Sequence, residues 1–151
     1  MRIFLDTNVV MDYLTSRGDE QATEKIFESI DSGGNIGFIS TGSFYTIIYL
    51  AERFLKESGV KNPKRLHQLR EILSGLLDSL EIAELSREFL FAGANDMQFK
   101  DLEDSCQLQA AKISSCPCLI TTSKKDFKES DTTTIEILTP KEFTKKYLSR
   151  N

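Results

Sequence analysis

The residues best suited to chemistry in this 151-residue chain are acids that stand in three separate segments. Asp6 directly follows a short apolar run, Asp126 follows another, and Asp101, Glu103 and Asp104 crowd the start of a predicted helix. Carboxylates gathered without a nearby histidine or cysteine favour hard cations such as Mg²⁺ or Mn²⁺. Such ions bind phosphate oxygens and activate water for an in-line displacement. The pattern therefore indicates metal-dependent chemistry on a phosphodiester.

Each of these acids also has a purely structural interpretation. Asp6 and Asp101 could each cap a helix, because short acids accept hydrogen bonds from the unpaired N–H groups at helix starts. Glu103 and Asp104 would then favour the positive end of the helix dipole. Asp126 lies in a Lys-Lys-Asp-Phe segment and could be an ordinary turn residue. Spacing alone leaves both interpretations open.

The elements that must position these acids are short apolar runs alternating with longer helical patterns. This alternation is typical of an α/β fold with a mainly parallel sheet. The predicted strands are 3–5, 36–40, 80–83, 118–122 and 135–138. Helices are predicted at 9–14, 20–31, 43–57, 63–77, 86–92 and 101–114, and from 140 onward. Ligands of open α/β sheets gather beyond the carboxyl ends of the strands, where Asp6 and Asp126 would lie.

Side-chain spacing also predicts which helix faces are buried. In the helix at 101–114, the predicted inner face consists of Leu102, Cys106, Ala110 and Ile113. On the helix at 43–57, the spacing of Phe44, Tyr45 and Tyr49 favours a place in the core over base stacking.

The composition predicts one globular domain spanning residues 1–151. Hydrophobic residues make up 40% and charged residues 28%, which excludes collagenous, coiled-coil and wholly disordered chains. The net charge of −4 argues against indiscriminate coating of nucleic acid but not against a locally basic groove. No apolar stretch is long enough to predict a secretion signal or a membrane association.

The cysteines do not form a disulfide framework. Their number is odd, and two of the three, Cys106, Cys116 and Cys118, are separated by a single residue. We interpret them as reduced thiols that pack as small hydrophobic residues, and we therefore expect a cytoplasmic protein.

Three segments together resemble the PIN-domain family of metal-dependent ribonucleases. They are Asp6-Thr7-Asn8-Val9, the segment 99–105 and the segment 119–127, and 138–143 resembles one bacterial branch of the family. The resemblance implies a three-layer α/β/α fold with a mainly parallel sheet of about five strands. It also implies Mg²⁺- or Mn²⁺-dependent cleavage of RNA, a homodimer, and a VapC-like toxin held by an antitoxin protein.

The resemblance assigns roles to individual acids. Asp6 matches the family's first acid and Asp104 its acid on the later helix, so these two are the expected metal ligands. Asp101 matches an extra acid of this branch, and Asp126 matches a following Asp-Phe pair. We expect Asp101 and Asp126 to assist catalysis.

Two positions depart from the family's pattern. Thr46 stands where the family often has a glutamate, and Ser123 where many members have Asp or Asn. We therefore expect one metal ion rather than two. Asn8, Thr46 and Ser123 are expected to surround the metal ligands and to orient them or water by hydrogen bonds. Asn8 and Ser123 would serve equally well in satisfying turn backbone.

Lys124 and Lys125 are the expected RNA contacts, because lysines beside the acids would position phosphates without reading sequence. The leading hypothesis is an endoribonuclease. The alternative is a catalytically weakened module that binds RNA or a protein, since Thr46 replaces the glutamate. A phosphatase with Asp6 as nucleophile is disfavoured, because the haloacid-dehalogenase pattern needs an aspartate where Asn8 stands.

Overall fold

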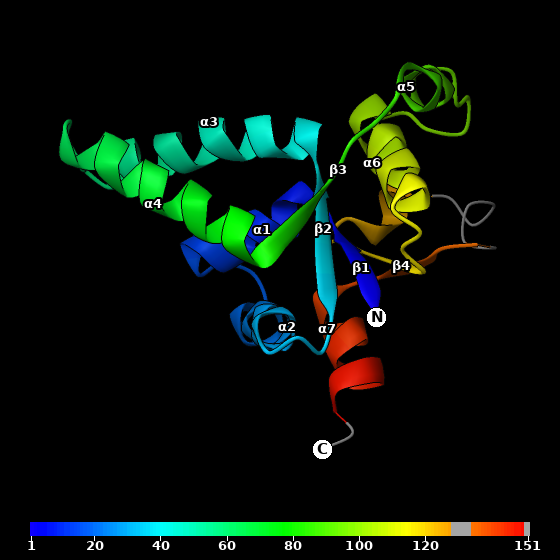
Figure 1. Ribbon diagram of the computed structural model, residues 1–151, viewed down its shortest axis with the longest axis horizontal. Coiled ribbons are helices and arrows are strands. Elements are labelled where there is room, and N and C mark those ends of the chain that lie inside the picture. Colours follow the sequence, from blue (N-terminus) through cyan, green and yellow to red (C-terminus); the bar gives the residue numbers. More distant parts are fainter. Residues whose placement is uncertain (128–133, 150–151) are drawn as a thin grey trace.

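The computed structural model describes residues 1–127 and 134–149 and contains a five-stranded sheet (Figure 1). The strands are β1 (Arg2–Leu5), β2 (Ile36–Ser40), β3 (Leu80–Ala83), β4 (Cys118–Ile120) and β5 (Glu136–Leu138). Their order is β3-β2-β1-β4-β5, and every neighbouring pair is parallel. The central strand is β1, where Phe4 lies opposite Phe38 of β2 and Leu119 of β4. The predicted parallel sheet is confirmed.

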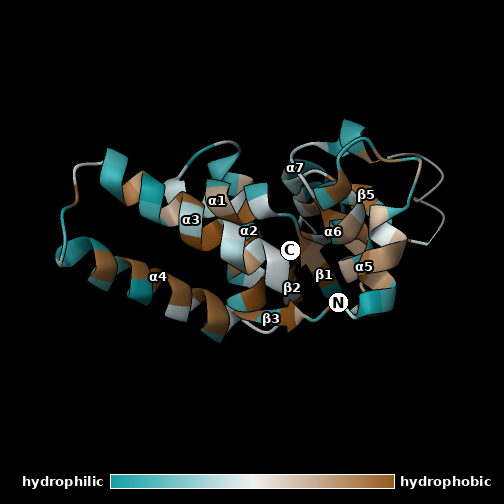
Figure 2. Ribbon diagram, turned by 90° about the horizontal axis from the view of Figure 1, so that it is seen from above, coloured by the Kyte–Doolittle hydropathy of each residue, from teal (hydrophilic) through white to brown (hydrophobic). Residues whose placement is uncertain are grey.

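Helices cover both faces of this sheet. They are α1 (Thr7–Thr15), α2 (Glu20–Asp31), α3 (Thr41–Glu57), α4 (Lys64–Ser79), α5 (Arg87–Ala94), α6 (Leu102–Ile113) and α7 (Pro140–Phe143). Figures 1 and 2 place α1 and α2 on one side of the sheet and α5 and α6 on the other. This arrangement is the predicted three-layer α/β/α fold. Within the described part of the chain, no helix is both long and apolar enough to cross a membrane.

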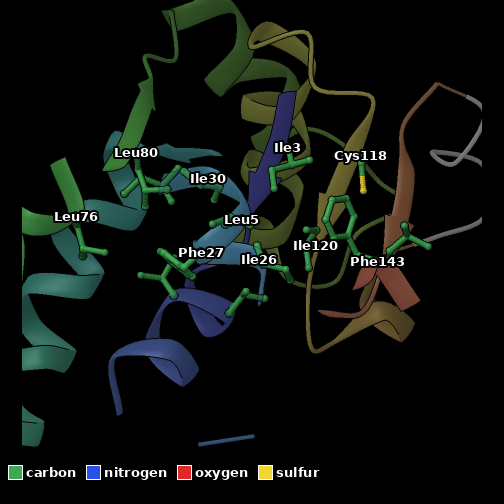
Figure 3. Close-up of a cluster of buried hydrophobic side chains, with 14 of the residues drawn as sticks. Ile3, Leu5, Ile26, Phe27, Ile30, Leu76, Leu80, Cys118, Ile120 and Phe143 are labelled. Carbon is green, nitrogen blue, oxygen red and sulfur yellow. The ribbon is translucent and has the colours of Figure 1, made fainter. Parts of the chain in front are cut away.

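The alternating side chains of β1 separate the core into two halves. Ile3 and Leu5 point into one cluster with residues of α2, α4 and α7, whereas Phe4 packs with α6 on the opposite face. Figure 3 shows the first cluster, with Ile26, Phe27 and Ile30 of α2 facing the strands. Strands buried on both faces are almost wholly apolar, and Figure 2 accordingly shows them mainly in brown.

Two features outside the sheet matter for the site. The helices α3 and α4 run side by side well beyond the sheet and share a small core of Ala51, Leu55 and Leu69 (Figure 1). Thr139 begins α7 with the predicted capping box: its hydroxyl accepts from the Glu142 backbone N, and Glu142 Oε2 accepts from the Thr139 backbone N.

The cysteines are free thiols, as expected, and Cys116 and Cys118 are buried in the core. Burial raises the pKa of Cys116 to about 11 and that of Cys118 to about 12, so both stay protonated at neutral pH. They therefore pack as small hydrophobic side chains.

Gly93 allows α5 and α6 to approach each other closely. A Cβ at Gly93 would lie 2.8 Å from Cys106 Sγ and 3.3 Å from Cys106 Cα, and the Gly93 carbonyl accepts from Ser105 Oγ at 2.8 Å. We expect Gly93→Ala to lower the free energy of unfolding by about 1–3 kcal/mol, because the two helices must separate. Urea denaturation measures the change.

The matched control is Gly75→Ala in α4. A Cβ at Gly75 meets nothing within 4 Å, and alanine favours the helix over glycine by about 1 kcal/mol. Gly75→Ala should therefore stabilise the protein. Equal effects of the two substitutions would contradict the close packing of α5 on α6.

Candidate active site

Asp6 lies at the carboxyl end of β1 and begins α1. Its backbone is extended (φ −65°, ψ 151°), and its Oδ1 accepts a hydrogen bond from the Thr7 backbone N at 2.8 Å. The side chain thus caps α1, as the structural interpretation expected. Asp6 is only 4% exposed. Because a buried carboxylate is costly unless it is hydrogen-bonded, its remaining partners decide whether it can stay charged.

Two side chains from distant segments complete the environment of Asp6. Thr121 Oγ1, just after β4, donates to Asp6 Oδ2 at 2.8 Å, and Gln107 Nε2 of α6 donates to Oδ1 at 3.3 Å. The backbone N of Ser123 donates to Thr121 Oγ1 at 3.0 Å. Since that bond occupies a lone pair of the Thr121 hydroxyl, the hydroxyl proton is left for Asp6.

Gln107 is the centre of a buried polar network. Its Oε1 accepts from Ser40 Oγ at 2.8 Å, and its Nε2 lies 2.5 Å from Ser43 Oγ and 3.3 Å from Thr7 Oγ1. The Thr7 and Ser43 hydroxyls are themselves 2.9 Å apart. The network joins the starts of α1 and α3 to α6 and to Asp6, so it fixes these elements relative to one another.

This network corrects the predicted inner face of α6. The buried residues of the helix are Ser105, Gln107, Leu108, Gln109, Ala110 and Ala111. Leu102, predicted to point inward, is 50% exposed. The sequence reasoning missed Gln107 and Thr121. The sequence did contain one indication of the role of Gln107. It follows Asp104 by three residues, which places both side chains on one side of the helix.

The other acids lie at the start of α6. Asp101 caps this helix, because its Oδ1 accepts from the backbone N of Glu103 at 2.9 Å and from that of Asp104 at 3.3 Å. Burial, followed by the negative charges of Asp6, Asp101, Asp126 and Glu103, raises the pKa of Asp104 to about 7. The acids of three segments therefore lie within electrostatic reach of one another.

The charges of this cluster are not compensated by the protein. Burial raises the pKa of Asp6 despite its hydrogen bonds, and burial and neighbouring acids raise that of Glu103. In the ranges 1–127 and 134–149, no lysine or arginine forms an ion pair with any of the five acids. Oxygen ligands with unpaired negative charge fit a divalent cation.

The spacing of the cluster limits how a cation would be held. Among the residues that the structure describes, no group of three or more His, Cys, Asp or Glu side chains is close enough to hold a metal ion. Mg²⁺ commonly takes only one or two carboxylates and keeps several waters. Asp6 and Asp104 fit that smaller set.

The remaining predicted residues, Asn8, Thr46 and Ser123, form no side-chain hydrogen bond to the clustered acids within the described part of the chain. Asn8 is exposed and, within the described chain, forms no side-chain hydrogen bond to Asp6. Thr46 Oγ1 donates to the Gly42 carbonyl of its own helix. Ser123 acts on Asp6 through its backbone N, which donates to Thr121 Oγ1. The orienting bonds expected from side chains of Asn8 and Ser123 are thus supplied by Thr7, Thr121 and Gln107.

The segment after β4 carries the predicted RNA contacts. Lys124, Lys125 and Asp126 form a 3₁₀ turn and are all exposed. Lys124 Nζ lies 3.1 Å from both carboxylate oxygens of Glu142, so its charge is shared with that acid.

A family model described as the PIN domain matches residues 2–125. The chain belongs to the PIN domain family. The matched range contains Asp6, Asp101 and Asp104 and ends one residue before Asp126. No curated protein matches the chain significantly in sequence.

The solved structures that share this PIN domain's fold include two VapBC assemblies. VapBC2 from Rickettsia felis, bound to a DNA fragment from its promoter, has a TM-score of 0.63 at 18% identity, covering 91% of this chain and 97% of that chain. VapBC-1 from nontypeable Haemophilus influenzae has a TM-score of 0.64 at 17% identity, covering 93% and 99%. At this identity the likeness shows the fold.

The uncompensated charge should lower the stability of the metal-free PIN domain, and this can be tested. We expect Asp104→Asn to raise the free energy of unfolding in EDTA by about 1–2 kcal/mol after allowance for solvent screening, because it removes repulsion among the acids. Thermal unfolding with EDTA and with MgCl₂ measures it. Mg²⁺ should stabilise the parent more than the variant.

Asp78→Asn is the control for net charge, since Asp78 is exposed on α4. It should leave both the EDTA stability and the Mg²⁺ effect at parental values. If Asp104→Asn were less stable than the parent in EDTA and Mg²⁺ stabilised both proteins equally, the acids would not repel one another as proposed.

Proposed function

We propose that this PIN domain is an endoribonuclease that hydrolyses RNA phosphodiester bonds with Mg²⁺ or Mn²⁺. The observation that carries the proposal is the uncompensated negative cluster around Asp6 and Asp104 at the carboxyl edge of the sheet. A phosphodiester would be repelled by this cluster unless a cation neutralised it. Family membership supports the same activity.

Asp6 and Asp104 are the proposed ligands of the cation. When bound, the ion would neutralise phosphate oxygens and lower the pKa of water. Thr7, Thr121 and Gln107 hold the Asp6 carboxylate in one orientation. Two of these bonds go to Oδ1 and one goes to Oδ2, so the second lone pair of Oδ2 is left to bind the cation. Asp101 and Asp126 add negative charge beside Asp104 and assist.

Lys124 and Lys125 are the proposed contacts to RNA phosphates on the rim of the cluster. Both are exposed beside Asp126. Lys124 would exchange its ion pair with Glu142 for one with a phosphate oxygen. Its ammonium group would therefore be paired with a negative charge both before and after RNA binds.

We further propose that residues 1–151 form a single domain, that the protein is a cytoplasmic homodimer, and that it is the toxin of a toxin–antitoxin pair. The VapBC assemblies that share its fold over most of the chain support a protein antitoxin as partner.

The decisive test is cleavage of varied single-stranded RNAs with Mg²⁺ or Mn²⁺ against EDTA. We expect cleavage only with metal, and Asp6→Ala should lower the rate by more than the roughly 10–100-fold typical of losing a residue that only supports a metal ligand. Asp6→Asn, which retains a helix cap, guards against loss of the fold. Asp78→Ala serves as the control, and equal rates for parent and Asp6→Asn would refute the mechanism.

The second candidate is a weakened PIN domain that binds RNA or a protein without cutting RNA. The observation in its favour is Thr46, which stands where a glutamate is usual. Among the described residues, its side chain hydrogen-bonds only to the Gly42 carbonyl of its own helix. Under this function the parent cuts no RNA, whereas Thr46→Glu gains metal-dependent cleavage. Cleavage by the parent itself would reject the second candidate.

A further inference from the structure

A mainly apolar cavity of about 370 Å³ opens next to the acidic cluster, between the start of α3 and the helices α5 and α6. Its lining includes Tyr45, Glu84, Leu85, Leu90, Glu103 and Gln107. The volume falls within the roughly 300–1,000 Å³ of small-molecule sites. The cavity is therefore large enough to hold one part of a ligand, such as an aromatic ring.

The cavity adjoins the proposed site of cleavage through Gln107 and Glu103. Gln107 lines the cavity and also donates to Asp6 Oδ1 at 3.3 Å. Glu103 lines it as well and is the neighbour of Asp104 in the first turn of α6. A group that enters this cavity therefore lies beside whatever is held at Asp6 and Asp104.

The lining of the cavity includes an exposed aromatic ring. Tyr45 is 70% exposed although its helical spacing predicted a core position, and Leu90 is 46% exposed. An exposed aromatic ring beside aliphatic side chains is the surface on which unpaired bases stack. Tyr49, one turn further along α3, is similarly exposed but does not line this cavity.

The charged groups of the cavity select the chemistry of its ligand. They are the carboxylates of Glu84 and Glu103, which when ionised accept hydrogen bonds and donate none. Such a cavity repels a phosphate and accepts a group that carries N–H donors. Guanine presents two adjacent donors, N1–H and N2–H₂, on its Watson–Crick edge, whereas each other base presents one such group.

We infer that this cavity binds an unpaired nucleobase next to the scissile phosphodiester, with guanine preferred, stacked on Tyr45 and facing Glu84 and Glu103. The inference rests on the proposed function and deepens it, since it names the substrate as RNA that is single-stranded at this position. A base in a duplex cannot enter, because its Watson–Crick edge is already occupied.

The test follows cleavage of a random-sequence RNA pool by Tyr45→Ala, with Tyr49→Ala as the matched control. Base stacking is worth a factor of about 5–150 per base. We therefore expect Tyr45→Ala to lower kcat/KM by that factor and to lose the enrichment of guanine at a fixed position beside the cut. Tyr45→Phe should restore both, and Tyr49→Ala should match the parent. Because both tyrosines are mostly exposed, neither substitution disturbs the core.

Glu84→Gln tests the recognition of the base edge. It replaces an acceptor-only carboxylate with an amide that also donates. We expect the guanine enrichment beside the cut to fall in Glu84→Gln and to stay at the parental level in Asp78→Asn, the exposed control on α4. An unaltered preference in both Tyr45→Ala and Glu84→Gln, with the parent active, would overturn the inference and leave the proposed function standing.

A binding measurement in EDTA separates this inference from the proposed function. Fluorescence anisotropy compares a labelled guanine-containing RNA tetranucleotide with an all-uracil one, both with uncharged methylphosphonate linkages, because the metal-free acidic cluster repels phosphates. Tighter binding of the guanine-containing RNA, lost in Tyr45→Ala, supports the cavity even if the parent cuts nothing. Equal binding by parent and Tyr45→Ala overturns it, as does Tyr45-dependent binding of an arginine-containing peptide without binding of RNA.

Discussion

The buried carboxylate of Asp6 is the constraint on which the site depends. A charge that is 4% exposed must be matched by hydrogen-bond donors, and Asp6 takes its donors from three places. These are the backbone of Thr7 in α1, the hydroxyl of Thr121 after β4 and the amide of Gln107 in α6. The ends of β1 and β4 and one face of α6 must therefore meet at one point, and the parallel sheet supplies that meeting point.

The same geometry concentrates negative charge that the protein does not neutralise. Asp101 and Asp104 reach the edge because α6 begins there, with Asp101 capping it. The resulting repulsion, added to burial, raises the pKa of Asp104 to about 7. A cluster that destabilises the metal-free fold while offering oxygen ligands is understandable as a binding site, since a cation would convert the repulsion into attraction.

The sequence predicted the scaffold better than the polar interior. The strands were predictable because each is a short apolar run, and the Thr139–Glu142 capping box because its residue types are specific. The convergence of Asp6 and Asp104 followed from the parallel sheet, whereas their role as metal ligands stays a prediction. Gln107 and Thr121 were not predicted, because a lone polar residue in a helix or at a strand end is usually on the surface.

The exposure of Tyr45 and Tyr49 has a different origin. The buried row of α3 is Ile47, Ala51 and Leu55. Tyr45 and Tyr49 lie on the opposite face of the helix, which no other element covers within the described residues. Which apolar face of a helix is buried thus depends on the elements packed around it, and the spacing of its residues alone does not determine this. The exposed ring of Tyr45 then becomes available to the cavity beside the acids.

The most direct measurement is the location of Mn²⁺ by anomalous diffraction from crystals soaked in MnCl₂. We expect one anomalous peak between the carboxylates of Asp6 and Asp104, with Thr121 and Gln107 still bonded to Asp6. The absence of a peak there at saturating Mn²⁺, or a peak held only by Asp101, Glu103 or Asp126, would contradict this expectation.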